Sequence, residues 1–175
     1  MSSFTIKQCS CVDMEVDAIV NAANGYMLHD GGIAGAIKAK AGRELDDACH
    51  KYNLPISDGE NIVTPAFNIS NAKIIIHAVG PNFYNTPDAF KELFEAYYNS
   101  LISLREYEYH SIAFPLISSG LFGGNIKEPT RKSAKECIRA YNKFINEYPG
   151  YDIDAVLCCY SDSEYRKVLD EFNKD

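Results

Sequence analysis

Two polar, glycine-rich stretches hold the residues of this chain that are best suited to chemistry. They run over 21–37 (NAANGYMLHDGGIAGAI) and 115–126 (PLISSGLFGGNI), and neither contains Lys or Arg. Glycines let several backbone N–H groups point at one place, and a following helix adds partial positive charge, so such stretches suit phosphate oxygens. If they hold an anion, backbone amides hold it. The alternative, that both are only tight turns, stays open.

Neither stretch carries a better-known phosphate-binding or catalytic motif. A nucleotide triphosphate loop ends in Lys followed by Ser or Thr, and a dinucleotide-binding turn reads Gly-x-Gly-x-x-Gly; neither motif is present. There is no Gly-x-Ser-x-Gly elbow, and no cysteine lies beside a histidine in either stretch. The sequence therefore disfavours kinases, GTPases, dinucleotide dehydrogenases and covalent catalysis.

The cysteines form no metal-binding pattern. A Cys-x-Cys pair, two single cysteines and a vicinal pair make up the set: Cys9, Cys11, Cys49, Cys137, Cys158 and Cys159. We therefore expect free thiols, several of them in the core, and neither a metal nor a cofactor. The alternative is that Cys9, Cys11, Cys158 and Cys159 meet as a redox or metal site.

Apolar runs of strand length alternate with segments of helical period, which is typical of an α/β fold with helices on both faces of a sheet. The predicted strands are 4–8, 16–21, 61–67, 73–79, 111–117 and 153–159, and the predicted helices are 33–52, 87–106, 130–147 and 163–173. The third and fourth strands are too closely joined for a crossover helix. That pair should be antiparallel, and the sheet mixed.

Length and charge limit the classes of partner. A chain of 175 residues with a net charge of −7 predicts one acidic domain over 1–175, which should not bind a nucleic-acid backbone. No apolar run is long enough to span a membrane, and the amino terminus has no apolar signal core. We expect a cytoplasmic monomer.

Four segments resemble the motifs of the macro domain family in their order along the chain. They are 16–24 (VDAIVNAAN), 30–37 (DGGIAGAI), 76–81 (IHAVGP) and 115–123 (PLISSGLFG). The resemblance covers nearly the whole chain and implies a three-layer α/β/α sandwich around a mostly parallel sheet of about six strands. It also implies binding of ADP-ribose, which many members hydrolyse from modified proteins, nucleic-acid ends or O-acetyl-ADP-ribose.

The resemblance implies a role for residues in both stretches. Asn24 would hydrogen-bond the distal ribose near the scissile bond, Phe122 would pack on that ribose, and Tyr160 would lie against the adenine. For the two aromatic residues, ordinary edge packing remains the alternative. The implied ligand-binding residues are Ser10, Cys11, Asn21, Ala22, Asn24, Gly31, Gly32, Ile33, Ala34, Pro115, Ser118, Ser119, Gly120, Leu121, Phe122 and Tyr160.

Three positions depart from the family pattern. Ser10 stands where an aspartate usually accepts a hydrogen bond from the adenine amino group. Ala34 stands where MacroD-type hydrolases carry a catalytic aspartate; in having alanine there, the chain resembles viral macro domains. Asp30 replaces a glycine; it could orient or deprotonate a water, or be a solvent-facing turn residue or helix cap. His29 could contact a water at the terminal ribose, whereas His77 is expected to be a satisfied strand-end histidine.

The resemblance leaves two main functions open, beside a third possibility, a divergent macro fold for another ligand such as an ADP-ribose derivative or RNA; the net charge of −7 weighs against RNA. The first is hydrolysis of ester-linked ADP-ribose, on Asp or Glu side chains or in O-acetyl-ADP-ribose, by a positioned water, with Asn24, Asp30 and His29 as candidate catalytic residues. The second is a reader module that binds ADP-ribose without cleaving it, which Ala34 favours. The partner in both cases is ADP-ribose or an ADP-ribosylated protein.

Overall fold

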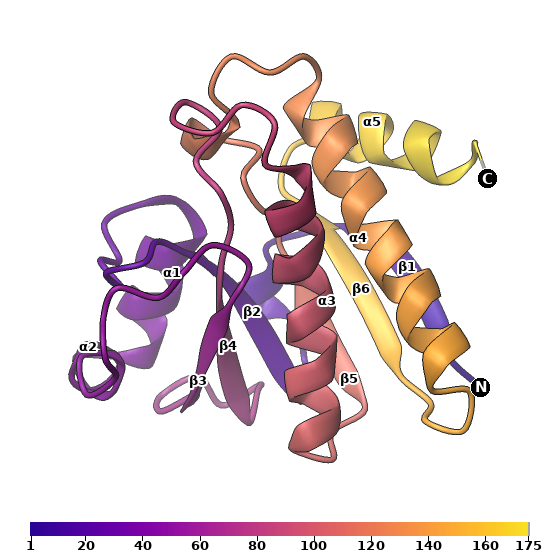
Figure 1. The fold of residues 1–175 in the computed structure, drawn as a ribbon. Helices are drawn as coiled ribbons and strands as arrows, with labels where there is room; N and C mark the ends of the chain where they lie inside the picture. Colours follow the sequence, from indigo (N-terminus) through magenta and orange to yellow (C-terminus); the bar gives the residue numbers. More distant parts are fainter. Residues whose placement is uncertain (175) are drawn as a thin grey trace.

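A mixed six-stranded sheet lies at the centre of the fold (Figure 1). The computed structural model describes residues 1–174. In spatial order β1-β6-β5-β2-β4-β3, the strands are β1 (Ser3–Gln8), β6 (Asp154–Cys159), β5 (Ser111–Phe114), β2 (Ala18–Ala23), β4 (Ile74–Val79) and β3 (Asn61–Pro65). Neighbours are parallel except for β3 and β4, which are antiparallel. This confirms the predicted strand number and the predicted antiparallel pair.

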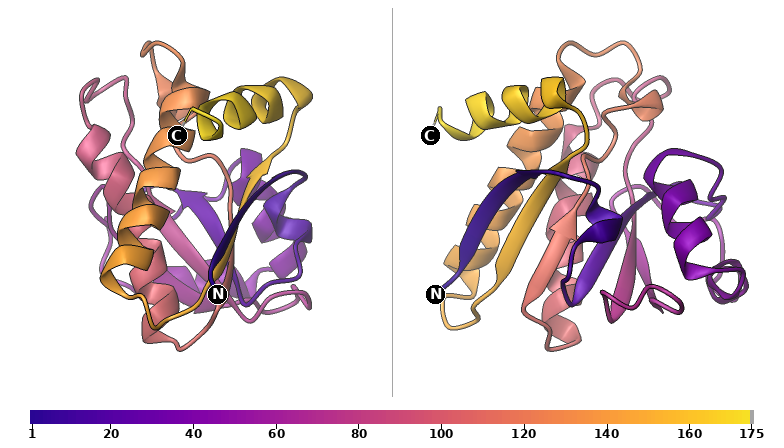
Figure 2. Two further views of the ribbon diagram at one scale, coloured as in Figure 1. Left: turned by 90° about the vertical axis from the view of Figure 1, so that its right-hand side faces the viewer. Right: turned by 180° about the vertical axis from the view of Figure 1, so that it is seen from behind.

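Helices cover both faces of the sheet, so the predicted three-layer sandwich is confirmed. The helices α1 (Gly32–Ala41) and α2 (Glu44–Cys49) lie on one face, and α3 (Phe90–Glu106) and α4 (Pro129–Glu147) lie on the other (Figure 2). The last helix, α5 (Asp162–Phe172), packs on α4 and the edge strand β1. Within residues 1–174, no helix is both long and apolar enough to cross a membrane.

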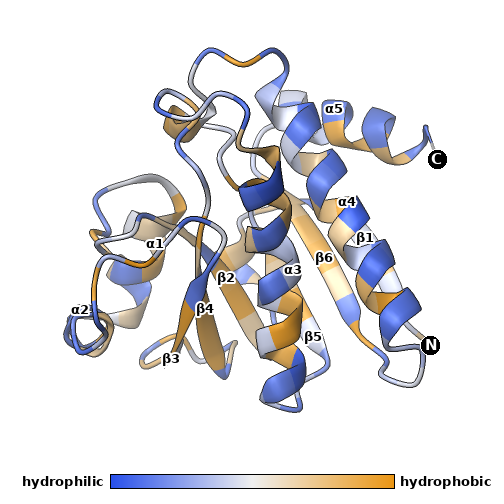
Figure 3. Ribbon diagram, in the orientation of Figure 1, coloured by the Kyte–Doolittle hydropathy of each residue, from blue (hydrophilic) through white to orange (hydrophobic). Residues whose placement is uncertain are grey.

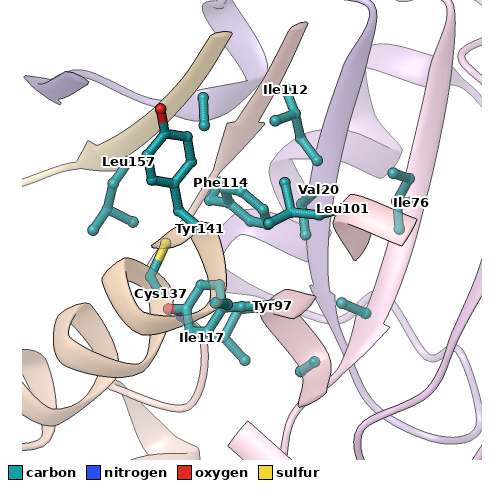
Figure 4. Packing of buried hydrophobic residues seen from close by; sticks show 14 of the residues in the cluster. Val20, Ile76, Tyr97, Leu101, Ile112, Phe114, Ile117, Cys137, Tyr141 and Leu157 are labelled. Carbon is teal, nitrogen blue, oxygen red and sulfur yellow. Dashed lines mark hydrogen bonds between the residues drawn. The ribbon is translucent and has the colours of Figure 1, made fainter. Parts of the chain in front are cut away.

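Alternating strand residues supply two separate cores. On one side, Val20, Ile76 and Leu157 pack against α3 and α4 (Figure 4). On the other, Ile19 and Ile75 pack against α1 and α2. The strands β2, β4 and β6 are apolar along most of their length, because helices cover the sheet on both faces (Figure 3). The helices α3 and α4 carry polar residues on their outer faces, because only one side of each helix packs on the sheet.

Several predicted boundaries differ from the structure: the strands predicted over 111–117 and 61–67 end at Phe114 and Pro65, and the helix predicted over 87–106 begins at Phe90. Two further differences matter most for the site. The helix predicted over 33–52 is two helices, because Gly42 adopts a φ of 97° and its N–H caps α1 at Lys38 O, 2.9 Å away. The strand predicted over 16–21 begins and ends two residues later, at Ala18–Ala23. Asn21 is therefore inside the strand and not in the loop that follows it.

Two short 3-10 turns complete the parts that position the site. The first, η1 (Cys11–Asp13), follows β1, and the second, η2 (Leu121–Gly123), lies in the loop between β5 and α4. Phe83 N–H donates to Phe122 O over 2.8 Å. This bond ties the loop after β4 to the loop after β5.

Candidate ligand-binding site

A cavity of about 720 Å³ lies beyond the carboxyl ends of β2, β5 and β6, where open α/β sheets bind ligands. The loops after these strands, the start of α1, η1 and the start of α5 enclose it. Among the described residues that line it, none is Lys, Arg or His, and only Asp30 and Glu164 carry a formal charge. Any anion in the cavity must be held mainly by neutral groups.

Asn24 organises the first loop. Its Oδ1 accepts hydrogen bonds from the N–H groups of Tyr26 and Leu28, both over 3.1 Å, and its Nδ2 donates to Leu28 O over 2.8 Å. Met27, in the same loop, is fully buried in the core beneath it. Because an amide nitrogen carries two hydrogens, one N–H of Asn24 remains for a ligand. The side chain thus shapes the loop and still offers a donor to the cavity.

The first turn of α1 supplies backbone donors. Helix amides at the amino terminus have no acceptor within the helix, and no side chain caps α1. Gly31, Gly32, Ile33 and Ala34 all line the cavity. Gly31 and Gly32 leave the approach to these amides open, since a Cβ at either position would meet no atom within 4 Å. This end of the cavity fits an anionic group.

The second loop is held from below by buried polar groups. Tyr97 OH accepts from Ile117 N–H over 2.8 Å, and Ser133 Oγ donates to Ile117 O. Ser118 adopts a φ of 57° and its Oγ donates to Pro81 O over 2.7 Å. The segment after it, 119–122, forms one wall of the cavity. The loop is therefore fixed before any ligand binds.

Comparisons with known proteins decide the family. A family model described as Macro domain matches residues 20–133, which is more than half of the chain. The chain belongs to the macro domain family. A solved structure of the Oceanobacillus iheyensis macrodomain with ADP matches with a TM-score of 0.89 and 30% identity, covering 99% of this chain and 91% of that one.

Two relatives match most of this chain in sequence but differ in their own length. This macro domain is 35% identical over 169 residues to the O-acetyl-ADP-ribose deacetylase of Salmonella typhimurium, which covers 94% of this chain and 91% of the relative. It is 36% identical over 161 residues to an uncharacterized protein of Thermotoga maritima. That match covers 90% of this chain but 26% of the relative, so the macro domain spans about a quarter of the longer protein.

Most of the candidate residues line the cavity of this macro domain. The lining includes Ser10, Cys11, Ala22, Asn24, Asp30, Gly31, Gly32, Ile33, Ala34, Pro115, Ser118, Ser119, Gly120, Leu121, Phe122 and Tyr160. Asp30 is exposed and makes no capping hydrogen bond to α1, so it is a solvent-facing residue at the rim. Tyr160 is 80% exposed, so core packing does not account for it.

Asn21 and His29 do not line the cavity, although the resemblance places both in the site. Asn21 is fully buried in β2, and its Nδ2 lies 3.0 Å from His77 Nδ1. The side chain of His29 is fully buried, with Nε2 3.6 Å from Cys49 Sγ and 3.9 Å from Asp46. Both side chains therefore lie in the core, outside the lining of the cavity.

His29, Cys49 and His77 are the one group of metal-ligand types that residues 1–174 bring together, with their ligand atoms within 4.8 Å of one another. Hydrogen bonds account for His77, whereas His29 Nδ1 is buried without a partner among the described residues. His77 Nδ1 accepts from Asn21, and His77 Nε2 donates to Thr64 Oγ1 over 3.0 Å, so both ring nitrogens of His77 are occupied. This is the satisfied histidine that the sequence predicts.

The cluster makes stability depend on pH. Burial lowers the pKa of His77 to about 3 and also lowers the pKa of His29, so folding favours the neutral rings. An unfolded histidine has a pKa of about 6.5, so the full unfolding free energy is present above that pH. Part of it is lost as the pH falls from 6.5 toward 3, because the unfolded histidines bind protons that the folded ones do not. We expect the unfolding free energy to fall by up to about 1.4 kcal/mol per pH unit for each such histidine.

Urea unfolding between pH 7.5 and 5 measures this slope. His77→Gln should flatten it, whereas His50→Gln, which changes an exposed histidine, should leave it as in the wild type. An equal slope in the wild type and His77→Gln would contradict the assignment.

The structure adds lining residues that the sequence did not indicate. Leu28, Gly80 and Glu164 line the cavity from three different segments. Of the four cysteines considered for a shared site, Cys9, Cys11 and Cys158 line the cavity, but Cys159 belongs to the opposite core because neighbouring strand residues face opposite ways. Burial raises the pKa of the Cys158 and Cys11 thiols, which keeps them neutral.

A second cavity, of about 240 Å³, adjoins the first. The two share Asn24, Gly80 and Phe122, and the smaller one is otherwise lined by Gly25, Asp58, Val79, Asn82, Asn85 and Thr86. A ligand that ends at Asn24 in the large cavity would therefore have polar space beyond its end.

Proposed function

We propose that this macro domain binds ADP-ribose in the large cavity and hydrolyses ester-linked ADP-ribose with a positioned water. The substrates are ADP-ribosylated Asp or Glu side chains and O-acetyl-ADP-ribose. The observation that carries this proposal is a large cavity without basic residues, in which the first turn of α1 and the loop 118–122 face each other with backbone groups. Such a site suits a diphosphate between two neutral loops.

The comparisons support the same ligand. The Oceanobacillus structure holds ADP, and the Salmonella relative is named for deacetylation of O-acetyl-ADP-ribose. Both cover nearly all of this chain. The net charge of −7 does not oppose a small anion, because the phosphates would meet local amide dipoles and not the average charge of the surface.

The two adjoining cavities suit an ester as substrate. With the diphosphate between the loops, the free N–H of Asn24 donates to the distal ribose, and the group esterified to that ribose enters the smaller cavity. A water then attacks the acyl carbon, the bond from that carbon to the ribose oxygen breaks, and the ribose oxygen takes a proton. In the alternative route, for an Asp or Glu ester at the anomeric carbon, the water attacks that carbon, the bond from it to the carboxylate oxygen breaks, and the carboxylate leaves while the water gives up a proton. Positioning dominates over a strong base in either case, with Asp30 orienting the water at the rim.

The second candidate is a reader that binds ADP-ribose without cleaving it. Ala34 favours this function, because it is buried in the first turn of α1 and offers no ionisable group where MacroD-type hydrolases carry an aspartate. The two candidates require the same binding site and differ only in turnover.

One set of assays tests both functions. The protein is titrated with ADP-ribose in a calorimeter, and then incubated with O-acetyl-ADP-ribose and with a peptide ADP-ribosylated on Glu. Release of ADP-ribose from either substrate supports the hydrolase. Binding without release from either assigns the reader, and absence of binding rejects both functions.

Tyr160 provides a prediction at the other end of the cavity. Its exposed ring lines the cavity just after β6, so we expect it to stack on the adenine. Base–aromatic stacking contributes about 1–3 kcal/mol, and Tyr160→Ala should weaken ADP-ribose binding by about 5- to 150-fold. Tyr160→Phe should retain the affinity. Tyr84→Ala, which removes an exposed tyrosine that lines neither cavity, is the control.

A further inference from the structure

Glu164 gives the β6–α5 end of the large cavity a charge that the proposed function leaves unused. It is the one charged lining residue at this end, because Asp30, the other charged residue of the described lining, precedes α1. Its side chain is half-buried at the wall of the cavity. Whether one of its oxygens is available to a ligand depends on how the carboxylate is held.

The position of this carboxylate is fixed by the start of α5. Glu164 Oε1 accepts hydrogen bonds from Ser161 N–H over 3.0 Å and from Ser161 Oγ over 3.2 Å. In return, Glu164 N–H donates to Ser161 Oγ over 3.1 Å, which completes a capping box. Among residues 1–174, no donor is paired with Glu164 Oε2. One oxygen therefore holds the helix, and the other is free to accept a hydrogen bond.

The surroundings of Glu164 suit a flat, uncharged ring and not a phosphate. The ring of Tyr160 and the hydroxyl of Ser10 line the same cavity, together with the thiols of Cys9, Cys11 and Cys158. Cys9 N–H donates to Cys159 O over 3.0 Å, which brings the segment before η1 against the end of β6. An aromatic face, a weakly polar wall and one anionic acceptor are complementary to a heteroaromatic base with an exocyclic amino group.

We propose that Glu164 is a specificity-determining residue, whose Oε2 accepts a hydrogen bond from the exocyclic amino group of adenine. The proposal rests on the proposed binding of ADP-ribose. Ser10 offers only a neutral hydroxyl, so Glu164 supplies the charged acceptor from a different element. The same carboxylate repels the carbonyl oxygen that hypoxanthine carries in place of the amino group, and thereby disfavours the inosine analogue.

Calorimetric titration with ADP-ribose and with inosine diphosphate ribose tests the proposal in three proteins. The wild type should prefer the adenine ligand by about tenfold or more, since a charge-assisted hydrogen bond is replaced by repulsion. Glu164→Gln should reduce this preference to unity or reverse it, because the amide oxygen stays on Ser161 N–H and the amide nitrogen then faces the cavity, where it donates to the carbonyl of hypoxanthine and accepts nothing from adenine. Ser161→Ala breaks the capping box but keeps the carboxylate, so it should lower thermal stability and retain the preference.

The outcomes separate the two proposals. A wild type that binds neither ligand rejects the proposed function and the role of Glu164 together. A wild type that binds ADP-ribose but keeps its preference in Glu164→Gln rejects only the role of Glu164. Equal loss of preference in Ser161→Ala and Glu164→Gln would assign Glu164 to the helix cap alone.

Discussion

Replacing Asn24 with alanine is expected to weaken ADP-ribose binding by about 5- to 150-fold and to reduce ester hydrolysis at least as much. The substitution removes the donor proposed for the distal ribose. A ribose oxygen left buried without a donor costs about 1–3 kcal/mol of binding free energy. It also removes the two hydrogen bonds that Oδ1 accepts from Tyr26 and Leu28, which shape the loop. Calorimetry gives the loss of affinity, and release of ADP-ribose gives the loss of rate.

A second variant distinguishes the donor from the loop. Asn24→Asp keeps an oxygen for the N–H groups of Tyr26 and Leu28 but lacks both amide N–H groups, so it loses the bond to Leu28 O as well as the proposed ligand donor. We expect binding to be lost, and thermal unfolding of both variants measures how much of the loss comes from the loop. Asn53→Ala, in an exposed residue that lines neither cavity, is the matched control. Unchanged ADP-ribose affinity in Asn24→Ala would remove Asn24 from the site under both candidate functions.

The centre of the sheet could be predicted from the sequence because strands such as β2 and β4 are buried on both faces. Continuous apolar runs such as 73–79 indicate strands of this kind, and a five-residue connection excludes a crossover, so β3 and β4 had to be antiparallel. The break at Gly42 was less apparent, since apolar residues such as Ile37 and Leu45 continue at helical spacing on either side of it. Helical period alone does not show where one helix ends and another begins.

The positions of Asn21 and His29 could not be predicted from residue type. The predicted strand ends at Asn21, as a polar residue after an apolar run suggests, but β2 continues to Ala23 and buries Asn21. Its Nδ2 finds a partner in His77. His29 is similarly buried against Cys49. The partners of Asn21 Nδ2 and His29 Nε2 lie 56 and 20 residues away in sequence, so only the folded chain shows these contacts. Among the described residues, Asn21 Oδ1 and His29 Nδ1 are buried without a partner.

Glu164 was missed for a related reason. The sequence SDSE before an apolar helical pattern indicates a capping box, which explains a glutamate at this position without reference to any ligand. Only the packing of α5 beside the end of β6 shows that the same side chain also lines the cavity. One oxygen of the Glu164 carboxylate thus caps α5, and the other is the proposed acceptor for the ligand.

Gly80→Ala is expected to reduce both stability and ADP-ribose binding, because no room exists for a side chain at this position. A Cβ on Gly80 would lie 2.4 Å from Ile117 Cγ2 and 2.4 Å from Ser118 Oγ. Overpacking of this kind costs about 1–3 kcal/mol of unfolding free energy. The easiest relief is a shift of the loop that begins at Ile117, which breaks the bond from Ser118 Oγ to Pro81 O and moves the wall of the cavity. Urea unfolding and calorimetric titration measure the two effects.

Two further variants show whether the clash itself is responsible. Gly150→Ala adds a methyl group where no atom lies within 4 Å, and should match the wild type in both measurements. Ser118→Gly removes one of the two clashing groups and places glycine at a φ of 57°, so combining it with Gly80→Ala should restore part of the lost stability. If Gly80→Ala binds ADP-ribose as tightly as the wild type, the loop after β5 is free to move without affecting the ligand. The rigid wall at 118–122 would then play no part in holding the diphosphate.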